Sequence, residues 1–454
     1  MSDYGIGQLV AIRATLNDVL SRRAHWQIRG CVTASSATVL EVSGLREFCR
    51  VGDFVTIEAQ SDLLGEIVKV GHQSIQVKLL DDQARVSVGA RVLLGEAWSI
   101  KPCLDWTGRV VDCLGRPLDG MGTLPRGARK LTLEKQAVSA LTRKRVGAHV
   151  KTGVRVIDAF VPICQGQRIG IFAGSGVGKS TLIGMLACLG EFDRVVVSLV
   201  GERGREVREF IEDVIGPAAQ KCLLVVSTSN ESAMKQKLSA LTAMTAAEYF
   251  SEQGFSVLFI MDSVTRYANA LREVALSSGE PPVARGFPVS VFRDLSRYLE
   301  RAGPQTDGHG HITAIATVLV DGDDHNDPIS DAVRGILDGH IVLDRSIANS
   351  GRFPAIDVLS SVSRLSDRCW SPNEARVIGK LRGLISLYEE SKDMRSLGGY
   401  ERGRDPILDT AMDVAPQIYA KLQQPRAASE RNQETFDPIE FASKIGLIAG
   451  QVCS

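Results

Sequence analysis

The segment from Ala173 to Thr181, AGSGVGKST, combines glycines, a lysine and hydroxyl side chains in a spacing suited to nucleotide phosphates. Glycines allow backbone N–H groups to surround phosphate oxygens, the lysine reaches the β- and γ-phosphates, and the hydroxyl after it ligates Mg²⁺. A site for ATP and Mg²⁺ is expected, although Ala173 stands where the strict pattern G-x-x-x-x-G-K-[ST] has its first glycine. Its binding residues are predicted to be Gly174, Ser175, Gly176, Val177, Gly178, Lys179, Ser180 and Thr181.

Two carboxylates come just after long apolar runs. Asp262 directly follows SVLFIM, and Glu202 comes shortly after RVVVSLV. Because the carboxyl ends of parallel strands meet at one edge of a sheet, both should face the crevice that holds Lys179. Ser180 and Asp262 are predicted to hold the metal, and Glu202 to orient the attacking water. Two alternatives stay open: Asp262 could simply begin a loop, and Glu206 could take the place of Glu202.

These residues need a parallel sheet with a helix at the end of the glycine loop. A strand is predicted over 168–172 and a helix over 181–189, so the helix N-terminus also favours the bound anion. The fold class is predicted to be α/β, a P-loop (RecA-like) parallel-sheet core with an N-terminal small β-barrel and a C-terminal helical domain. The predicted regions are an amphipathic helix (1–22), the barrel (23–96), the P-loop ATPase domain (97–366) and the helical domain (367–454). The first of these is expected to dock either on a partner or on its own domain.

Composition narrows the class of protein. Lys+Arg and Asp+Glu both number 53, so no net basic field attracts nucleic acid, and no nucleic-acid partner is expected. The nine cysteines contain no C-x-x-C pair, which indicates neither a zinc site nor a disulfide framework. Apolar runs are of strand length, and the first residues lack the layout of a signal peptide, which predicts a cytoplasmic protein.

Two further groups of residues resemble metal sites but are interpreted as structural. The acidic run 321–327 lacks the glycine and the terminal glutamate of an EF-hand loop, so a solvated turn is the better interpretation. His309 and His311 alternate as in an extended segment, but no third ligand lies at a suitable spacing.

The order of regions and several phrases resemble the rotary ATP synthase α/β subunit family, and within it the flagellar and type III secretion export ATPases. The resemblance extends from about residue 25 to the C-terminus. It is carried by the glycine loop together with GRVVDCLGRPLDG (108–120), TGVRVID (152–158), GERGREVREFIED (201–213), DSVTRYANALRE (262–273) and DGHIVLDR (338–345). Ala173 is also typical of the secretion branch, whereas the ATP synthase β subunit has glycine there.

The resemblance implies a role for individual residues. The catalytic set is Lys179, Glu202, Arg203, Asp262, Arg266 and Arg364. Phe353, in GRFP, resembles the aromatic residue that stacks on adenine, with a buried core phenylalanine as the alternative. Arg364, in SVSR, resembles the arginine finger that one subunit donates to its neighbour's site, with a surface ion pair as the alternative.

The resemblance also implies an assembly and partners. Since one chain carries both Glu202 and Arg364, a homo-hexameric ring with equivalent sites is expected, in which 285–292 lines the central opening. The implied partners are regulator and stalk proteins of the export apparatus, export substrates with their chaperones, and a membrane export gate. The implied location is the cytoplasm, peripheral to the inner face of the cell membrane.

The expected function is ATP hydrolysis that energises protein export through a flagellar-type apparatus, releasing or unfolding substrates from chaperones at the gate. A virulence or symbiosis type III injector uses the same core and is the first alternative. A rotary ATP synthase subunit and a ring-shaped RNA helicase are alternatives of another class, and the balanced charge disfavours the helicase. A non-catalytic nucleotide-binding scaffold is disfavoured by Glu202.

Overall fold

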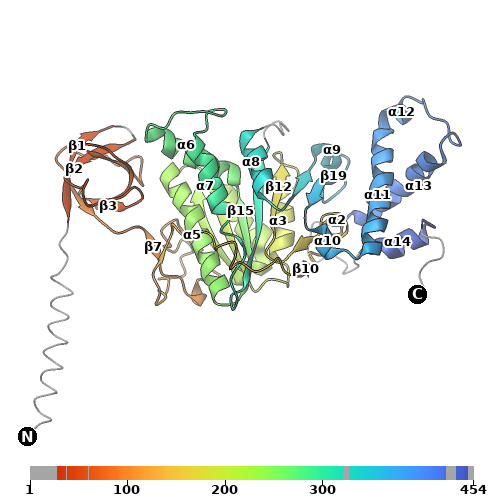
Figure 1. The fold of residues 1–454 in the computed structure, drawn as a ribbon, viewed down its shortest axis with the longest axis horizontal. Helices are drawn as coiled ribbons and strands as arrows, with labels where there is room; N and C mark the ends of the chain where they lie inside the picture. The colour runs from red at the N-terminus through yellow and green to blue at the C-terminus, as the bar shows by residue number, and fades with distance from the viewer. Residues whose placement is uncertain (1–27, 37, 60, 321–326, 426–435, 448–454) are drawn as a thin grey trace, which may run out of the picture. The chain divides into compact units, whose positions relative to one another are not determined.

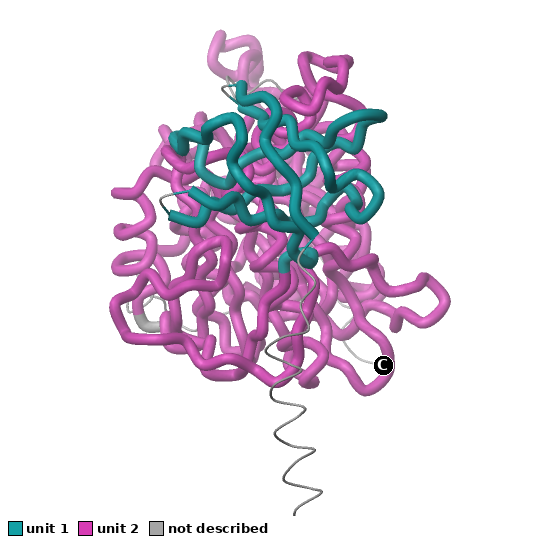
Figure 2. Tube along the Cα trace, turned by 90° about the vertical axis from the view of Figure 1, so that its left-hand side faces the viewer, with its two compact units in different colours: residues 1–98 teal, residues 99–454 magenta. Residues whose placement is uncertain are grey.

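The computed structural model describes residues 28–36, 38–59, 61–320, 327–425 and 436–447. The chain forms two compact units, residues 1–98 and 99–454, which Figure 2 colours separately. The segment 1–22, where an amphipathic helix was predicted, and most of the acidic run 321–327 lie outside the described residues.

The first unit contains a closed barrel of six antiparallel strands in the order β1-β2-β5-β4-β3-β6. The strands are β1 (Arg29–Ser35), β2 (Leu40–Ser43), β3 (Phe54–Ile57), β4 (Leu63–Val70), β5 (Ile75–Leu79) and β6 (Arg91–Leu94). Alternate residues point inward, and Val42, Ile57, Ile67 and Val77 are fully buried in the barrel core. Closure leaves no open sheet edge in this small unit.

The second unit is built on a nine-stranded sheet, with β19-β18-β12-β17-β15-β13-β14-β8 in order and β16 paired to β17. Its strands are β8 (Val110–Val111), β12 (Arg168–Ala173), β13 (Arg194–Glu202), β14 (Cys222–Thr228), β15 (Ser256–Asp262), β16 (Gly303–Pro304), β17 (His311–Leu319), β18 (Gly339–Leu343) and β19 (Ile356–Ser363). The pairings are parallel from β12 to β8, while β19 and β16 pair antiparallel. The central strands are buried over nearly their whole length, as the continuous apolar runs predicted.

Helices cover the sheet on both sides, and Figure 1 shows α5, α6 and α7 side by side. The helices of this region are α2 (Arg155–Phe160), α3 (Lys179–Ala187), α4 (Gly204–Glu209), α5 (Ala233–Glu252), α6 (Val264–Ser277), α7 (Val289–Leu299), α8 (Pro328–Ile336) and α9 (Arg345–Asn349). α4 is followed by a π-helical turn, Phe210–Ile215, and a 3₁₀ turn, Gly216–Lys221. The remaining short elements are β7 (Ser99–Ile100), η1 (Leu104–Trp106), β9 (Leu131–Thr132), β10 (His149–Val150) and β11 (Ile163–Cys164).

The chain ends in helices, which are α10 (Ser366–Cys369), α11 (Pro372–Glu390), α12 (Lys392–Ser396), α13 (Pro406–Leu422) and α14 (Pro438–Lys444). A capping box between Ser371 and Glu374 begins α11. Leu381 and Ile418 are fully buried between α11 and α13, in an apolar core that continues into the core of the sheet. α11 to α14 all lie in the region where the sequence predicted a helical domain, 367–454.

The predicted fold class is confirmed: a six-stranded barrel, a parallel-sheet nucleotide-binding core and C-terminal helices. Among the described helices, none has both the length and the apolar composition needed to cross a membrane.

Candidate active site

The glycine loop connects β12 to α3, as the sequence predicted. β12 ends at Ala173 and α3 begins at Lys179. Gly176 and Gly178 have φ angles of +81° and +98°, a left-handed conformation that other residues adopt only with strain. The loop therefore turns its backbone N–H groups and the positive end of the α3 dipole towards one space, a cradle suited to phosphate.

A lysine and an aspartate meet across this space. The Lys179 Nζ lies 2.5 Å from the Asp262 Oδ1, and Asp262, the last residue of β15, is 3% exposed. The buried Thr317 hydroxyl donates a second hydrogen bond of 2.7 Å to the same carboxylate oxygen. Asp262 is thus part of the site and does not merely begin a loop. Thr317 was not predicted, although a threonine in the apolar strand HITAIATVL is the kind of signal that marks such a contact.

Glu202 ends β13 and is 8% exposed. The Arg266 Nη2 lies 3.3 Å from the Glu202 Oε2, and the Arg266 Nη1 donates to the carbonyl of Gly201. Burial, a hydrogen bond with Glu206 and the charge of Asp262 raise the pKa of Glu202 to about 7. A carboxyl whose pKa lies near neutrality suits a group that accepts a proton during turnover.

A cavity of about 620 Å³ joins these groups. Its walls include most of the predicted site: Gly174, Ser175, Gly176, Gly178, Lys179, Ser180, Thr181, Glu202, Arg203, Glu206, Asp262 and Arg266. Arg203 precedes α4, and its largely exposed side chain lies 3.5 Å from Glu206. Glu206 thus remains beside Glu202 as a second carboxylate, but it is exposed where Glu202 is buried.

Phe353 and Val177 lie at the other side of the loop, where they line a small hollow with Thr181 and Gln424. Phe353 is half-buried, so its ring is not enclosed in the core. The Gln424 N–H donates to the Phe353 carbonyl at 2.9 Å, and its side-chain amide donates to the carbonyl of Gly153 at 2.8 Å. Gln424 was not among the predicted site residues, so this buried contact was missed.

Arg364 does not join the other predicted residues within one chain. It is exposed at the end of β19 and does not line the cavity. Its guanidinium donates to the carbonyl of Arg334 at 3.1 Å, and its backbone N–H to that of Asp338 at 3.0 Å. Among the described residues, no carboxylate pairs with it, so the alternative of a surface ion pair is not realised here.

Metal ligation rests on few protein groups. No cluster of three or more His, Cys, Asp or Glu residues suited to a metal occurs in the described part of the chain. Mg²⁺ in a phosphate site takes one or two protein oxygens and completes its shell with phosphate and water. Ser180, exposed at the start of α3, and Asp262 fit that donor set. His309 and His311 bond instead to the hydroxyls of Thr306 and Ser256.

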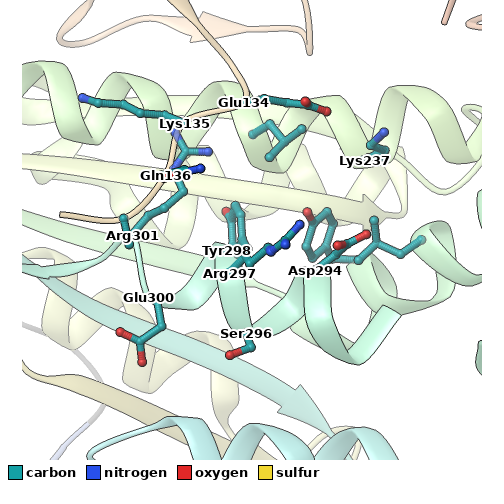
Figure 3. Close-up of a pocket in the computed structure, with 14 residues that line it drawn as sticks. Glu134, Lys135, Gln136, Lys237, Asp294, Ser296, Arg297, Tyr298, Glu300 and Arg301 are labelled. Carbon is teal, nitrogen blue, oxygen red and sulfur yellow. The ribbon is translucent and has the colours of Figure 1, made fainter. Parts of the chain in front are cut away.

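A larger cavity of about 700 Å³ lies elsewhere, between α5, α6, α7 and residues 134–137 (Figure 3). Arg301, on its wall, donates to Glu248 at 2.8 Å, and the two side chains are almost fully buried. Arg301 also donates to the Leu133 carbonyl and the Thr245 hydroxyl. This cavity is not lined by the glycine loop, so cavity volume alone does not identify the nucleotide-binding site.

Fold and site together define a P-loop ATPase of the ATP synthase α/β type. Residues 153–363 match the model of the ATP synthase alpha/beta family, nucleotide-binding domain. Residues 370–440 match that of the T3SS EscN ATPase C-terminal domain. The chain belongs to the flagellar and type III secretion export ATPases within that family, as the resemblance in the sequence implied.

Relatives named "Flagellum-specific ATP synthase" are 50% identical over 396 residues in Agrobacterium fabrum and 45% identical over 381 residues in Bacillus subtilis. These matches cover 87% and 82% of this chain, and 84% and 86% of the relatives. The solved structure of the assembled ATPase EscN from the enteropathogenic E. coli type III secretion system matches with a TM-score of 0.84 at 38% identity. That match covers 92% of this chain and 99% of EscN. EscN in complex with its central stalk EscO matches with a TM-score of 0.81 at 36% identity, over 92% of this chain and 99% of that one.

Proposed function

We propose that this ATPase energises protein export through a flagellar apparatus, acting at the cytoplasmic face of the cell membrane. The observation that carries the proposal is the convergence of Lys179, Glu202 and Asp262 on one cavity beside the glycine loop. The names of the relatives support the flagellar assignment. Release or unfolding of chaperoned substrates at an export gate is the work that we assign to the hydrolysis.

In the proposed mechanism the phosphates of ATP enter the cradle, and Lys179 exchanges Asp262 for the β- and γ-phosphates. Ser180 and Asp262 would hold Mg²⁺, which would supply positive charge to the phosphates. Glu202 positions a water molecule for in-line attack and accepts its proton, since its pKa of about 7 leaves it partly ionised at neutral pH. Arg266 holds Glu202 towards the cavity.

Among the described residues of one chain, Lys179, Arg203 and Arg266 line the cavity, and Arg364 does not. We assign the role of arginine finger to Arg364 of a neighbouring copy in a homo-hexameric ring, because Arg364 is exposed and does not line its own cavity. The solved structure of the assembled EscN supports an oligomer, and the EscN–EscO complex supports a stalk protein as partner. In such a ring, 285–292 is assigned to the central opening. We assign to Phe353 the role of stacking on the adenine ring. Gln424 stabilises this pocket through its hydrogen bonds to the carbonyls of Phe353 and Gly153.

The assignment is tested by measuring ATP hydrolysis over a series of protein concentrations, with molar mass followed by light scattering. Specific activity should rise as the ring assembles, because each site needs a neighbour. Full activity in a dilute monomer would remove the ring and the shared arginine. Inactivity in every state would point to a subunit that depends on a second kind of chain.

The high structural similarity to EscN makes an injector the second candidate. Complementation separates the two systems. The gene should restore swimming to a strain that lacks its flagellar export ATPase, and a Lys179→Ala variant should not. Restoration of injector secretion without motility would favour the second candidate.

A further inference from the structure

Two cysteines that the ATPase mechanism does not use lie against each other. The Cys164 Sγ and the Cys369 Sγ are 3.1 Å apart, although 205 residues separate them in the sequence. A disulfide bond is about 2.05 Å long, so a movement of about 1 Å would join the sulfurs. Cys164 is fully buried in β11, while Cys369 is half-exposed at the end of α10.

The two sides of this contact differ in how firmly they are held. The Cys164 N–H donates to the Gln167 side chain at 2.8 Å, and the Gln167 amide donates in turn to the Ser363 hydroxyl at 3.2 Å. Cys369 ends a helix of only four residues, whose Arg368 donates a hydrogen bond of 3.4 Å to the Val146 carbonyl. A small shift of α10 therefore suffices to bring the sulfurs together.

The charges around the pair favour reaction at one sulfur. Contact with Cys369 lowers the pKa of the Cys164 thiol, burial raises it, and the positive charge of Arg368 lowers it. The same contact, together with burial, raises the pKa of Cys369. A thiolate is the nucleophile in thiol oxidation, and half-exposed Cys369 marks the side from which a small oxidant reaches it.

We propose that Cys164 and Cys369 form an oxidation site, at which peroxides convert the two thiols reversibly into an intramolecular disulfide that slows ATP turnover. The Cys164 thiolate attacks one peroxide oxygen, the O–O bond breaks, and a sulfenic acid and hydroxide form. The Cys369 sulfur then attacks the Cys164 sulfur, the S–S bond forms and the S–O bond breaks. The two thiol protons leave with the oxygens, so two thiols and one hydrogen peroxide give one disulfide and two waters.

The position of α10 explains the expected effect on turnover. α10 stands between Arg364, at the end of β19, and α11, which begins three residues after Cys369. A disulfide to β11 would fix the point at which the chain passes from the sheet to the C-terminal helices. Closing motions of domains and loops limit turnover in many enzymes, and a fixed connection hinders them. The effect on turnover rests on the proposed role of Arg364, whereas the formation of the disulfide does not.

The test treats the full-length protein with hydrogen peroxide, maps disulfides by mass spectrometry without reduction, and measures ATP hydrolysis before and after dithiothreitol. We expect a peptide linking Cys164 to Cys369, loss of most activity and its recovery on reduction. Cys369→Ser should keep its activity under peroxide. Cys103→Ser, which removes another half-exposed cysteine, should remain as sensitive as the wild type.

Two results would overturn the proposal: no linked peptide at a peroxide concentration that oxidises Cys103, or equal loss of activity in Cys369→Ser. A linked peptide with unchanged turnover would overturn the regulatory effect and leave the proposed function intact. If Cys369→Ser does not fold, peptide mapping still tests whether the disulfide forms: the linked peptide should appear in the oxidised wild type and be absent from Cys164→Ala. Failure of the shared arginine would appear separately, as full activity in Arg364→Ala.

Discussion

The two large cavities of the second unit are both lined by charged side chains, yet they use charge in opposite ways. Beside α5, the Arg301 guanidinium is fully occupied by Glu248, Thr245 and Leu133. Beside the glycine loop, Lys179 and Arg266 pair with Asp262 and Glu202 on the wall of the cavity itself, and the pKa of Glu202 is raised to about 7. An ion pair enclosed in the core stabilises a fold, whereas a carboxyl on a cavity wall with a pKa near neutrality is available for chemistry. The charged groups and their pKa values therefore identify the active cavity, whereas a comparison of the two cavity volumes does not.

The strongest test of this comparison concerns the arginine that we assign to a neighbouring chain. Arg364→Ala should lower kcat by about 10³–10⁵, because an arginine finger stabilises charge in the transition state. Mixing Arg364→Ala with Glu202→Gln chains should restore activity, since about a quarter of the sites in random rings then have both groups intact. Activity is measured by phosphate release. No recovery on mixing would place Arg364 within its own chain's site or outside the chemistry.

The next largest effect should come from the buried carboxyl. Glu202→Gln keeps the shape but cannot accept a proton, so kcat should fall by about 10²–10⁴ while thermal stability is kept. Glu206→Gln is the matched control, since that neighbouring carboxylate is exposed, and it should retain most of the activity. The reverse result, with Glu206→Gln inactive and Glu202→Gln active, would exchange their roles.

Substitutions on the wall of the other cavity, beside α5, should change the stability of the fold and leave ATP turnover unchanged. Arg301→Met leaves Glu248 buried without its main partner, so the free energy of unfolding should fall by about 3–5 kcal/mol. Urea denaturation measures the loss, and turnover per folded molecule should be unchanged. Arg297→Met, an exposed arginine on the same cavity, should change stability by less than about 0.5 kcal/mol. A large loss of turnover in folded Arg301→Met would show that this cavity also serves catalysis.

The raised pKa of Glu202 also predicts a pH dependence. Burial shifts the carboxyl from 4.5 to about 7, so it gains a proton as the pH falls through 7 and then cannot accept another. The kcat/KM should therefore fall by about tenfold per pH unit below pH 7. Steady-state assays between pH 5 and 9 check the profile. The residual activity of Glu202→Gln should lack this inflection; if it keeps it, another group titrates.

The smallest effect is expected at the edge of the active cavity. Phe353→Ala should raise the KM for ATP by roughly tenfold with little change in kcat, because stacking of a base on an aromatic ring contributes about 1–3 kcal/mol. Phe353→Tyr keeps the ring and should behave like the wild type. Equal KM values in all three proteins would mean that Phe353 does not touch the adenine.

The sequence was sufficient for the parts of the site that depend on local pattern. The glycine loop, β12, β13 and β15 could be predicted because buried parallel strands are continuous apolar runs and their ends meet at one edge. Thr317 and Gln424 were missed, since each acts through a contact with a residue far away in the chain, and the polar residue in an apolar strand that marks Thr317 does not name its partner. The π-helical turn at 210–215 was likewise invisible, because its residues also suit an ordinary helix.

Gln424 makes the nucleotide-binding region and the C-terminal helices difficult to exchange as separate modules. It lies just after α13, yet it accepts a hydrogen bond from the Arg155 N–H and donates to the carbonyl of Gly153. A chimera joined at α11 would import this glutamine, and with it one wall of the hollow beside Phe353, from the other parent. In this protein, replacing the C-terminal helices therefore also replaces one wall of the pocket beside the glycine loop.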